Sequence, residues 1–173
     1  MDIIAGQATA AKEVFEEQKD LDYLVFPIGG GGLSSGSILS TKYFGEKCKP
    51  IGVEPYLARD AKESLEKGTI QPQMPPISIA DGLRTSLGSN TFKILKDNIT
   101  ADDVILVDES EIIEATQLVL ERMKIVIEPS SATVVAAVLK DDRFRGKKVC
   151  CIISGGNIDM SGLFNDIRSM LKM

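Results

Sequence analysis

The sequence predicts an α/β fold in which helices flank an open parallel β-sheet. The first observation is that helical segments alternate with short apolar segments along the chain. The second is that these apolar segments are continuous, as in strands that are buried on both faces of a sheet. The third is that two of them end in glycine loops, at residues 29–32 and 154–157. Such loops are typical of ligand-binding turns at the carboxyl ends of parallel strands.

The first half of the chain shows two helix–strand repeats followed by a polar helix. Apolar side chains recur with helical spacing in the helices, and glycine ends the first strand. The three prolines between residues 68 and 79 predict an irregular crossing segment. The predicted elements are helix 7–19, strand 22–28, helix 33–44, strand 50–54 and a helix over about 57–67.

The second half continues the alternation after a short helix around residues 92–96. Asp108 with Glu111 three residues later is a variant of the capping box, which predicts the start of a helix. Glu128-Pro129 opens a helix rich in alanine and valine. The predicted elements are strand 103–107, helix 108–124, helix 128–140, strand 147–153 and a helix from about 161. We therefore expect residues 1–173 to form a single domain.

Composition excludes several classes of function. The chain has no histidine, which removes Ser-His-Asp and Cys-His catalysis and most catalytic zinc sites. A net charge of -5 and the absence of tryptophan argue against nucleic acid as a partner. No apolar run is long enough to span a membrane, and the first residues lack the basic start of a signal peptide. We therefore expect a cytoplasmic protein, and three cysteines without a disulfide framework fit a reducing compartment.

The cysteines do not form a disulfide framework by their spacing. Cys150 and Cys151 are neighbours on a predicted strand, so their side chains are expected on opposite faces of the sheet. Cys48 stands alone in the sequence.

The loop of four glycines is the strongest candidate binding site. Gly29, Gly30, Gly31 and Gly32 have no side chains, so successive N–H groups can converge on an anion at the start of the next helix. The alternative is a permissive turn, because glycine tolerates positive φ. The loop is neither a Walker A motif nor a Rossmann fingerprint, since it lacks both spacings. The second loop, Ser154-Gly155-Gly156-Asn157, can equally be a plain strand-to-helix turn on composition alone.

Five motifs in order resemble the fold-type II pyridoxal-phosphate (PLP) enzymes. They are Pro27-Ile28-Gly29-Gly30-Gly31-Gly32-Leu33, Gly52-Val53-Glu54-Pro55, Ile79-Ala80-Asp81-Gly82-Leu83, Arg122-Met123-Lys124-Ile125-Val126-Ile127-Glu128-Pro129 and Ile153-Ser154-Gly155-Gly156-Asn157. The chain is similar to the branch that contains serine racemase and the short serine/threonine dehydratases, over nearly its whole length. The resemblance implies the C-terminal part of the PLP-binding catalytic domain, in the tryptophan synthase β-like fold.

The resemblance also implies the residues that contact the cofactor. The glycine loop with Leu33 would hold the phosphate, Ser154 with Gly155 would meet the pyridine nitrogen, and Gly82 would lie against the ring. Glu128 would sit near the ring, although a Glu-Pro at a helix start is also common for structural reasons. Asn157 matches a position associated with ATP binding in the racemases.

A divalent-cation site is implied in the same way. Glu54 and Asp60 match its side-chain ligands, with the Ala58 carbonyl between them. Hard oxygen ligands suit Mg²⁺, Ca²⁺ or Mn²⁺. Without the resemblance, the sequence alone indicates only a glutamate at a strand end and a solvated aspartate on a helix.

No catalytic residue is expected in this chain. In the family, the lysine that forms a Schiff base with PLP lies in an N-terminal Ser-x-Lys motif that is followed by a Ser-Ser-Gly-Asn loop, and no lysine here is expected in that context. Ser34-Ser35-Gly36-Ser37 looks similar to this loop but belongs to the helix after the glycines. The racemase base, a serine, would also lie in the absent half. We therefore expect a companion: the N-terminal half as a separate polypeptide, a nicked full-length enzyme, or a homodimeric assembly that contains both pieces. The complete enzyme is expected to be a homodimer.

The implied activity is PLP-dependent removal of water and ammonia from L-serine or L-threonine, with serine racemisation as a further activity. The chain ends soon after the second glycine loop, so a regulatory domain is not expected. That favours a catabolic dehydratase or a racemase over a feedback-inhibited biosynthetic enzyme. One alternative is a truncated, non-catalytic paralogue that binds phosphate or metal, or regulates an intact subunit. Another is an unrelated α/β protein that binds phosphate.

Overall fold

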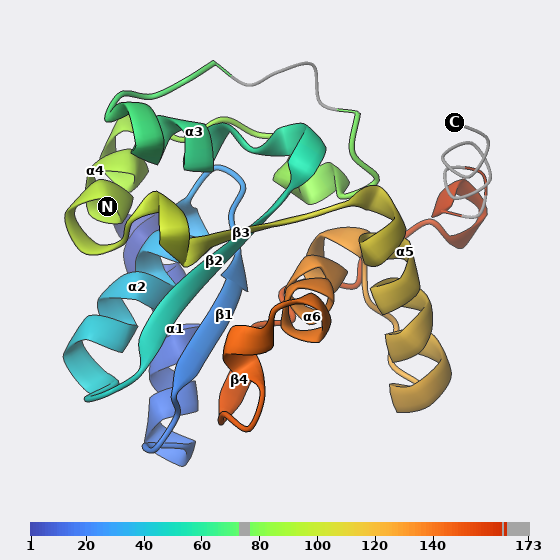
Figure 1. The fold of residues 1–173 in the computed structure, drawn as a ribbon, viewed down its shortest axis with the longest axis horizontal. Helices are drawn as coiled ribbons and strands as arrows, with labels where there is room; N and C mark the ends of the chain where they lie inside the picture. The colour runs from blue at the N-terminus through green and yellow to red at the C-terminus, as the bar shows by residue number, and fades with distance from the viewer. Residues whose placement is uncertain (73–76, 164, 166–173) are drawn as a thin grey trace.

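The computed structural model describes residues 1–72, 77–163 and 165, and these form helices on both sides of a four-stranded sheet (Figure 1). All strand pairs are parallel, and the strand order is β3-β2-β1-β4. The strands are β1 (Tyr23–Pro27), β2 (Lys49–Pro55), β3 (Val104–Val107) and β4 (Val149–Cys151). The predicted open parallel sheet is confirmed.

The helices lie in two layers. On one face α2 packs against β1 and β2, with α1 packed against α2; on the other face α6 packs against β1, β2 and β3, with α5 outside it. Short 3₁₀ turns and one π-helical segment connect the main elements. The main helices are α1 (Asp2–Glu17), α2 (Gly32–Phe44), α3 (Asp60–Lys67), α4 (Ser89–Asn98), α5 (Glu109–Leu118) and α6 (Pro129–Lys140). No helix among the described residues has the length and apolar character needed to cross a bilayer.

The strands are buried on both sides, as their continuous apolar sequences predict. On β1, Leu24 and Phe26 belong to the core under α1 and α2, whereas Val25 belongs to the core under α6. All three side chains are fully buried. Each strand residue therefore contributes to one of two cores, because successive side chains point to opposite faces.

Close contact between α1 and α2 depends on one glycine. A Cβ on Gly36 would lie 2.5 Å from the Ala8 nitrogen and 2.8 Å from the Gln7 carbonyl carbon. The Ser40 hydroxyl donates a 2.8 Å hydrogen bond to the Ala8 carbonyl across the same interface. Because α2 carries the glycine loop at its start, this packing helps to fix the loop's position.

Several predicted boundaries differ from those of the structure. The first helix begins at Asp2 rather than residue 7, and the short helix around 92–96 extends over α4. The predicted helix 57–67 is interrupted at Arg59, between a 3₁₀ turn (Tyr56–Ala58) and α3. The predicted helix 108–124 becomes α5 followed by a π-helical segment, Val119–Met123. The last predicted helix lies largely outside the described residues; its start is helical at 160–163.

The cysteines lie where the strand pattern places them. Cys151 packs against the core under α6 and Cys150 against the core under α1 and α2, so the predicted opposite orientation is confirmed. Cys48 is not isolated in space, because it packs in the same core as Cys150. Burial raises the pKa of the Cys48 and Cys151 thiols to about 12, and all three cysteines are free thiols. These cysteines therefore act as small core residues.

Candidate functional site

The two glycine loops lie side by side. The four glycines follow β1 and residues 154–157 follow β4, and β1 and β4 are neighbouring parallel strands. A cavity of about 170 Å³ is lined by Gly29, Gly30, Gly31, Gly32 and Ser154. Residues of both glycine loops therefore face one cavity.

The backbone of the glycine loop is free to bind an anion. Within residues 1–72, 77–163 and 165, no backbone or side-chain oxygen accepts a hydrogen bond from the N–H of Gly29, Gly30, Gly31 or Gly32. Gly31 has φ 88°, and a Cβ there would lie 2.6 Å from the Thr91 Cβ, so only glycine fits. Together with the first turn of α2, these N–H groups form a site of positive potential without a charged side chain.

Gly82 and Leu83 form one wall of this cavity. The Gly82 N–H donates a 3.0 Å hydrogen bond to the Ser130 hydroxyl at the start of α6. A Cβ on Gly82 would lie 2.9 Å from the Ser130 Oγ and 3.3 Å from the Glu128 Oε1. Gly82 therefore allows its loop to approach the start of α6 closely. Ser130 was not among the predicted site residues, although it directly follows Glu128-Pro129.

Glu128 connects this wall to the second glycine loop. Its N–H donates a 3.2 Å hydrogen bond to the Gly155 carbonyl, and a Cβ on Gly155 would lie within 2.6 Å of three carboxyl atoms of Glu128. Burial raises the pKa of the Glu128 carboxyl, and the nearby Asp81 adds to this rise, whereas the backbone N–H of Asn157 lowers it. Protonation of Glu128 is therefore easier than that of an exposed glutamate.

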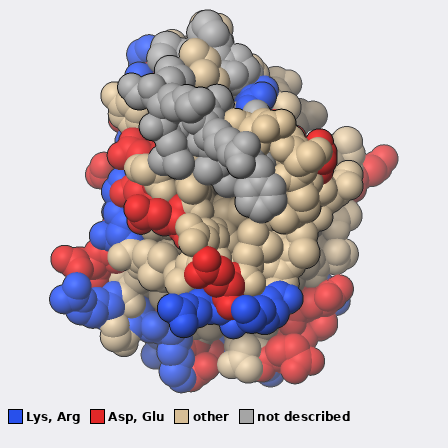
Figure 2. Space-filling model, turned by 90° about the vertical axis from the view of Figure 1, so that its right-hand side faces the viewer, with Lys and Arg blue, Asp and Glu red and all other residues tan. Residues whose placement is uncertain are grey.

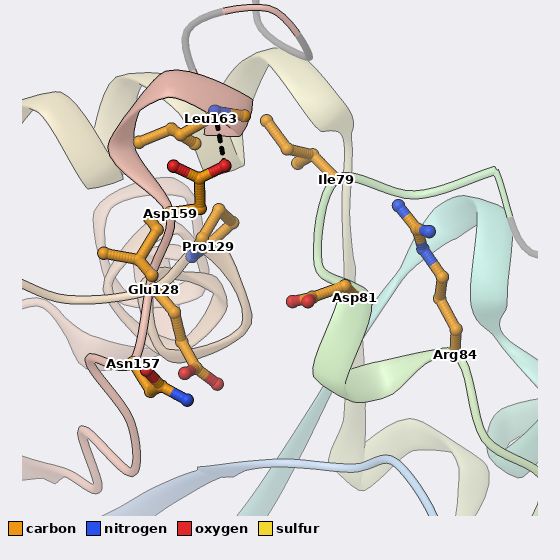
Figure 3. A pocket seen from close by; sticks show the side chains of 10 residues that line it. Ile79, Asp81, Arg84, Glu128, Pro129, Asn157, Asp159 and Leu163 are labelled. Atoms are coloured by element: carbon orange, nitrogen blue, oxygen red, sulfur yellow. Dashed lines mark hydrogen bonds between the residues drawn. The ribbon is translucent and has the colours of Figure 1, made fainter.

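A second cavity of about 240 Å³ adjoins the first and also contains Glu128 in its lining. Asp81, Arg84 and Asn157 line it as well (Figure 3). Figure 3 shows Asp81 extending from one side toward the side from which Glu128 and Asn157 come. The Arg84 Nε donates a 2.6 Å hydrogen bond to the Ser78 carbonyl. Asp81 and Arg84 were not predicted, since single charged residues near a loop carry no distinctive signal.

The ten residues predicted to contact a cofactor therefore lie in one region. Eight of them line the first cavity: the four glycines with Leu33, Gly82, Glu128 and Ser154. Asn157 lines the second cavity, and Gly155 touches the Glu128 carboxyl. The region combines backbone donors that have no partner among the described residues with a neutral hydroxyl, an arrangement that can bind a phosphate and a heteroaromatic nitrogen.

The predicted metal ligands lie elsewhere, at the carboxyl end of β2. Glu54 and Asp60 are only 1 % and 5 % exposed. The Glu54 carboxylate accepts 2.9 Å hydrogen bonds from the N–H groups of Ala61 and Lys62, so it caps α3. Burial raises the pKa of Glu54 to about 8, and it also raises the pKa of Asp60. Among the described residues, no group of three or more acidic or cysteine side chains could form a metal cage.

Neither Lys42 nor Lys124 is placed to form a Schiff base in the two cavities. Ser40-Thr41-Lys42 does contain serine and lysine two residues apart, but it lies in the last turns of α2, away from the glycine loop at the other end. The Lys42 Nζ donates to the Asn98 Oδ1 at 3.0 Å on the surface. Lys124 has φ 58° and ends the π-helical segment in an exposed position. Neither lysine lines the two cavities.

Comparison with known proteins gives matches over most of the chain. Residues 1–155 match the family described as "Pyridoxal-phosphate dependent enzyme". Serine racemase of Dictyostelium discoideum is 49 % identical over 168 residues, which cover 94 % of this chain and 51 % of the racemase. The L-threo-3-hydroxyaspartate ammonia-lyase of Saccharomyces cerevisiae is 45 % identical over 161 residues, which cover 92 % of this chain and 49 % of the lyase.

A solved structure shares the fold of this chain. The T.th. threonine deaminase superposes with a TM-score of 0.85 at 39 % identity, covering 91 % of this chain and 59 % of the deaminase. The chain spans about half the length of the curated relatives it matches.

Proposed function

Because this chain belongs to the pyridoxal-phosphate dependent enzymes, we propose that it is the phosphate- and nitrogen-binding part of a serine/threonine ammonia-lyase, with serine racemisation as a further activity. The observation that carries the proposal is the cavity between the two glycine loops. Its chemistry fits PLP: backbone N–H groups that find no acceptor in the described part of the chain suit a phosphate, and Ser154 offers a neutral hydroxyl on the opposite loop.

Each residue of the site has a proposed role. The N–H groups of Gly29 to Gly32 and of Leu33 bind the phosphate oxygens. The Ser154 hydroxyl, supported by Gly155, meets the ring nitrogen, and a hydroxyl does not hold that nitrogen protonated as a carboxylate would. Gly82 leaves room for the ring. Glu128 stands beside the ring and can hold a proton, consistent with its raised pKa. Asn157 lines the adjoining cavity, where we place the ATP contact.

When bound, PLP supplies an electron sink for bonds at the Cα of an amino acid. The protein around it then determines which bond breaks, by orienting the substrate and excluding water. Relatives named as serine racemase, L-threo-3-hydroxyaspartate ammonia-lyase and threonine deaminase support small hydroxy-amino acids such as L-serine and L-threonine as the substrate class. A cytoplasmic location and a homodimer of the complete enzyme belong to the same proposal.

We propose Glu54, the Ala58 carbonyl and Asp60 as ligands of a divalent cation such as Mg²⁺, Ca²⁺ or Mn²⁺. Two buried carboxyl groups support this proposal, because burial raises the pKa of both and the Asp60 carboxyl adds to the rise at Glu54, so a bound cation would offset the cost of ionising them. The hydrogen bonds from Ala61 and Lys62 leave further lone pairs on the Glu54 oxygens.

Surface charge supports a small-molecule role rather than binding to nucleic acid. The net charge is -5. On the side of the molecule viewed in Figure 2, lysine and arginine side chains alternate with aspartate and glutamate. Polyphosphate backbones require a basic excess, so we propose no nucleic-acid partner.

The experiment that tests the proposal combines this chain with the N-terminal half of the enzyme as a separate polypeptide. In the presence of PLP, 2-oxo acid should form from L-serine or L-threonine, and either polypeptide alone should be inactive. The alternative is a non-catalytic paralogue, which is supported by the lack of a lysine among the described residues that line the two cavities. That alternative predicts PLP binding by the mixture without 2-oxo acid formation. A mixture that binds no PLP would contradict the cofactor site itself.

A further inference from the structure

We infer that the hydroxyl of Ser34 is a side-chain ligand for the phosphate bound by the glycine loop. This inference rests on the proposed function and extends it, because the loop otherwise offers only backbone donors. Ser34 lies in the first turn of α2, two residues after the last glycine, and it lines the cavity of about 170 Å³.

The Ser34 side chain is buried without a hydrogen-bond partner. Its relative exposure is 1 %, and no group among the described residues accepts from or donates to its Oγ. A buried hydroxyl that lacks a partner destabilises the folded chain, so such groups are rare in folded proteins. A bound phosphate oxygen in the adjoining cavity would accept this hydrogen bond.

Ser34 differs from two other buried serines of α2 in that it lines the cavity. Ser35 and Ser37 are also fully buried and unpaired among the residues that the structure describes. Neither of them lines the cavity, whereas Ser34 does. A helical serine can instead donate to the carbonyl four residues before it. For Ser34 that carbonyl is Gly30, which accepts a 2.9 Å hydrogen bond from the Thr91 hydroxyl but, among the described residues, none from the Ser34 Oγ.

The location also suits the chemistry of a phosphate. The positive end of the α2 dipole and the unpaired N–H groups of the glycines attract an anion to this point. A hydroxyl at the same point adds a donor whose hydrogen can rotate toward the anion, and hydrogen bonds to charged acceptors are stronger than those between neutral groups.

The test compares Ser34→Ala with Ser37→Ala as a matched control from the same helix. Isothermal titration of the chain reassembled with the N-terminal half measures affinity for PLP and for pyridoxal, which has no phosphate. Ser34→Ala should bind PLP roughly tenfold or more weakly, the typical effect of losing a hydrogen bond to a charged group. Its affinity for pyridoxal should be unchanged. Ser37→Ala should match the wild type with both ligands, and the ³¹P resonance of bound PLP should shift only in Ser34→Ala.

Thermal melting without ligand separates binding from folding. Both alanine variants remove an unpaired buried hydroxyl, so both should melt at or above the wild-type temperature. Ser34→Cys, which keeps the size of the side chain but is a weak donor, should repeat the loss of PLP affinity if Ser34→Ala fails to fold. Wild-type PLP affinity in the Ser34 variants, or an equal loss with pyridoxal, would overturn the inference alone. Failure of every variant and of the wild type to bind PLP or inorganic phosphate would overturn the cofactor site as well.

Discussion

Replacement of Gly36 by alanine should destabilise the chain, although alanine is the better helix former. The new Cβ would lie 2.5–2.9 Å from three backbone atoms of Gln7 and Ala8 in α1. Carbon atoms in contact normally stay about 3.5–4 Å apart, so α1 would have to move away from α2 by roughly 1 Å. Backbone atoms cannot relieve the clash by rotating away, as the end of a flexible side chain can.

The magnitude follows from two opposing effects. Overpacking of this kind costs about 1–3 kcal/mol, and a separation of the helices would also weaken the Ser40–Ala8 hydrogen bond, worth about 1 kcal/mol. The gain in helix propensity from glycine to alanine is about 1 kcal/mol. We therefore expect a net loss of about 1–3 kcal/mol in the free energy of unfolding.

Gly6→Ala is the matched control. Gly6 lies in α1, and a Cβ there would meet no atom within 4 Å. This variant should therefore gain about 0.5–1 kcal/mol from propensity alone. Urea denaturation followed by far-ultraviolet circular dichroism measures both variants. If Gly36→Ala is as stable as Gly6→Ala, the close packing of α1 on α2 described above is wrong.

The remaining predictions concern the two sites. In chelator-containing buffer, stability should fall as pH rises between about 5 and about 8. Glu54 has a pKa of about 8 in the folded chain and near 4.5 when unfolded, so over this pH range the folded state holds a proton that the unfolded state has lost. Glu54→Gln should reduce the dependence of the urea midpoint on pH, and an unchanged dependence would refute the assignment. Gly155→Ala should displace the Glu128 carboxyl and lower the melting temperature, and this decrease should disappear when Glu128 is also replaced by alanine. If the two substitutions lower the melting temperature additively, Gly155 and Glu128 are not in contact. Asp60→Ala should abolish the stabilisation by added Mg²⁺ expected of the wild type; persistence of that stabilisation would exclude the proposed cation site. Ser154→Ala should weaken PLP binding and lower lyase activity in the reassembled enzyme, and unchanged kinetics would rule out contact with the ring nitrogen.

Much of the site could be predicted because its chemistry lies in short contiguous motifs. A run of glycines after an apolar strand indicates a backbone anion site wherever the strand falls in the sheet. The parallel arrangement then requires both glycine loops to lie at the same edge, since the carboxyl ends of parallel strands share it. The structure confirms this edge, and adds that β1 and β4 are neighbours.

The role of Glu54 could not be read from its motif. In the sequence it is a glutamate at a strand end, and Arg59 is a poor capping residue for the helix that follows. In the folded chain Glu54 accepts the N–H groups of Ala61 and Lys62 and so replaces a local cap, which explains why the predicted helix 57–67 is interrupted at Arg59. Such a tertiary cap depends on where β2 ends relative to α3.

The sequence by itself determined the fold class, the two glycine loops and the lack of a lysine in the expected context. These depend on local chemistry: apolar periodicity, the backbone freedom of glycine and the identity of single residues. Only the tertiary structure decided that Glu128 lies between Gly82 and Gly155, and that Ser34 is buried beside the glycine loop without a partner among the described residues. The physical reason is that burial and hydrogen-bond satisfaction depend on segments far apart in the chain, which no local pattern can specify.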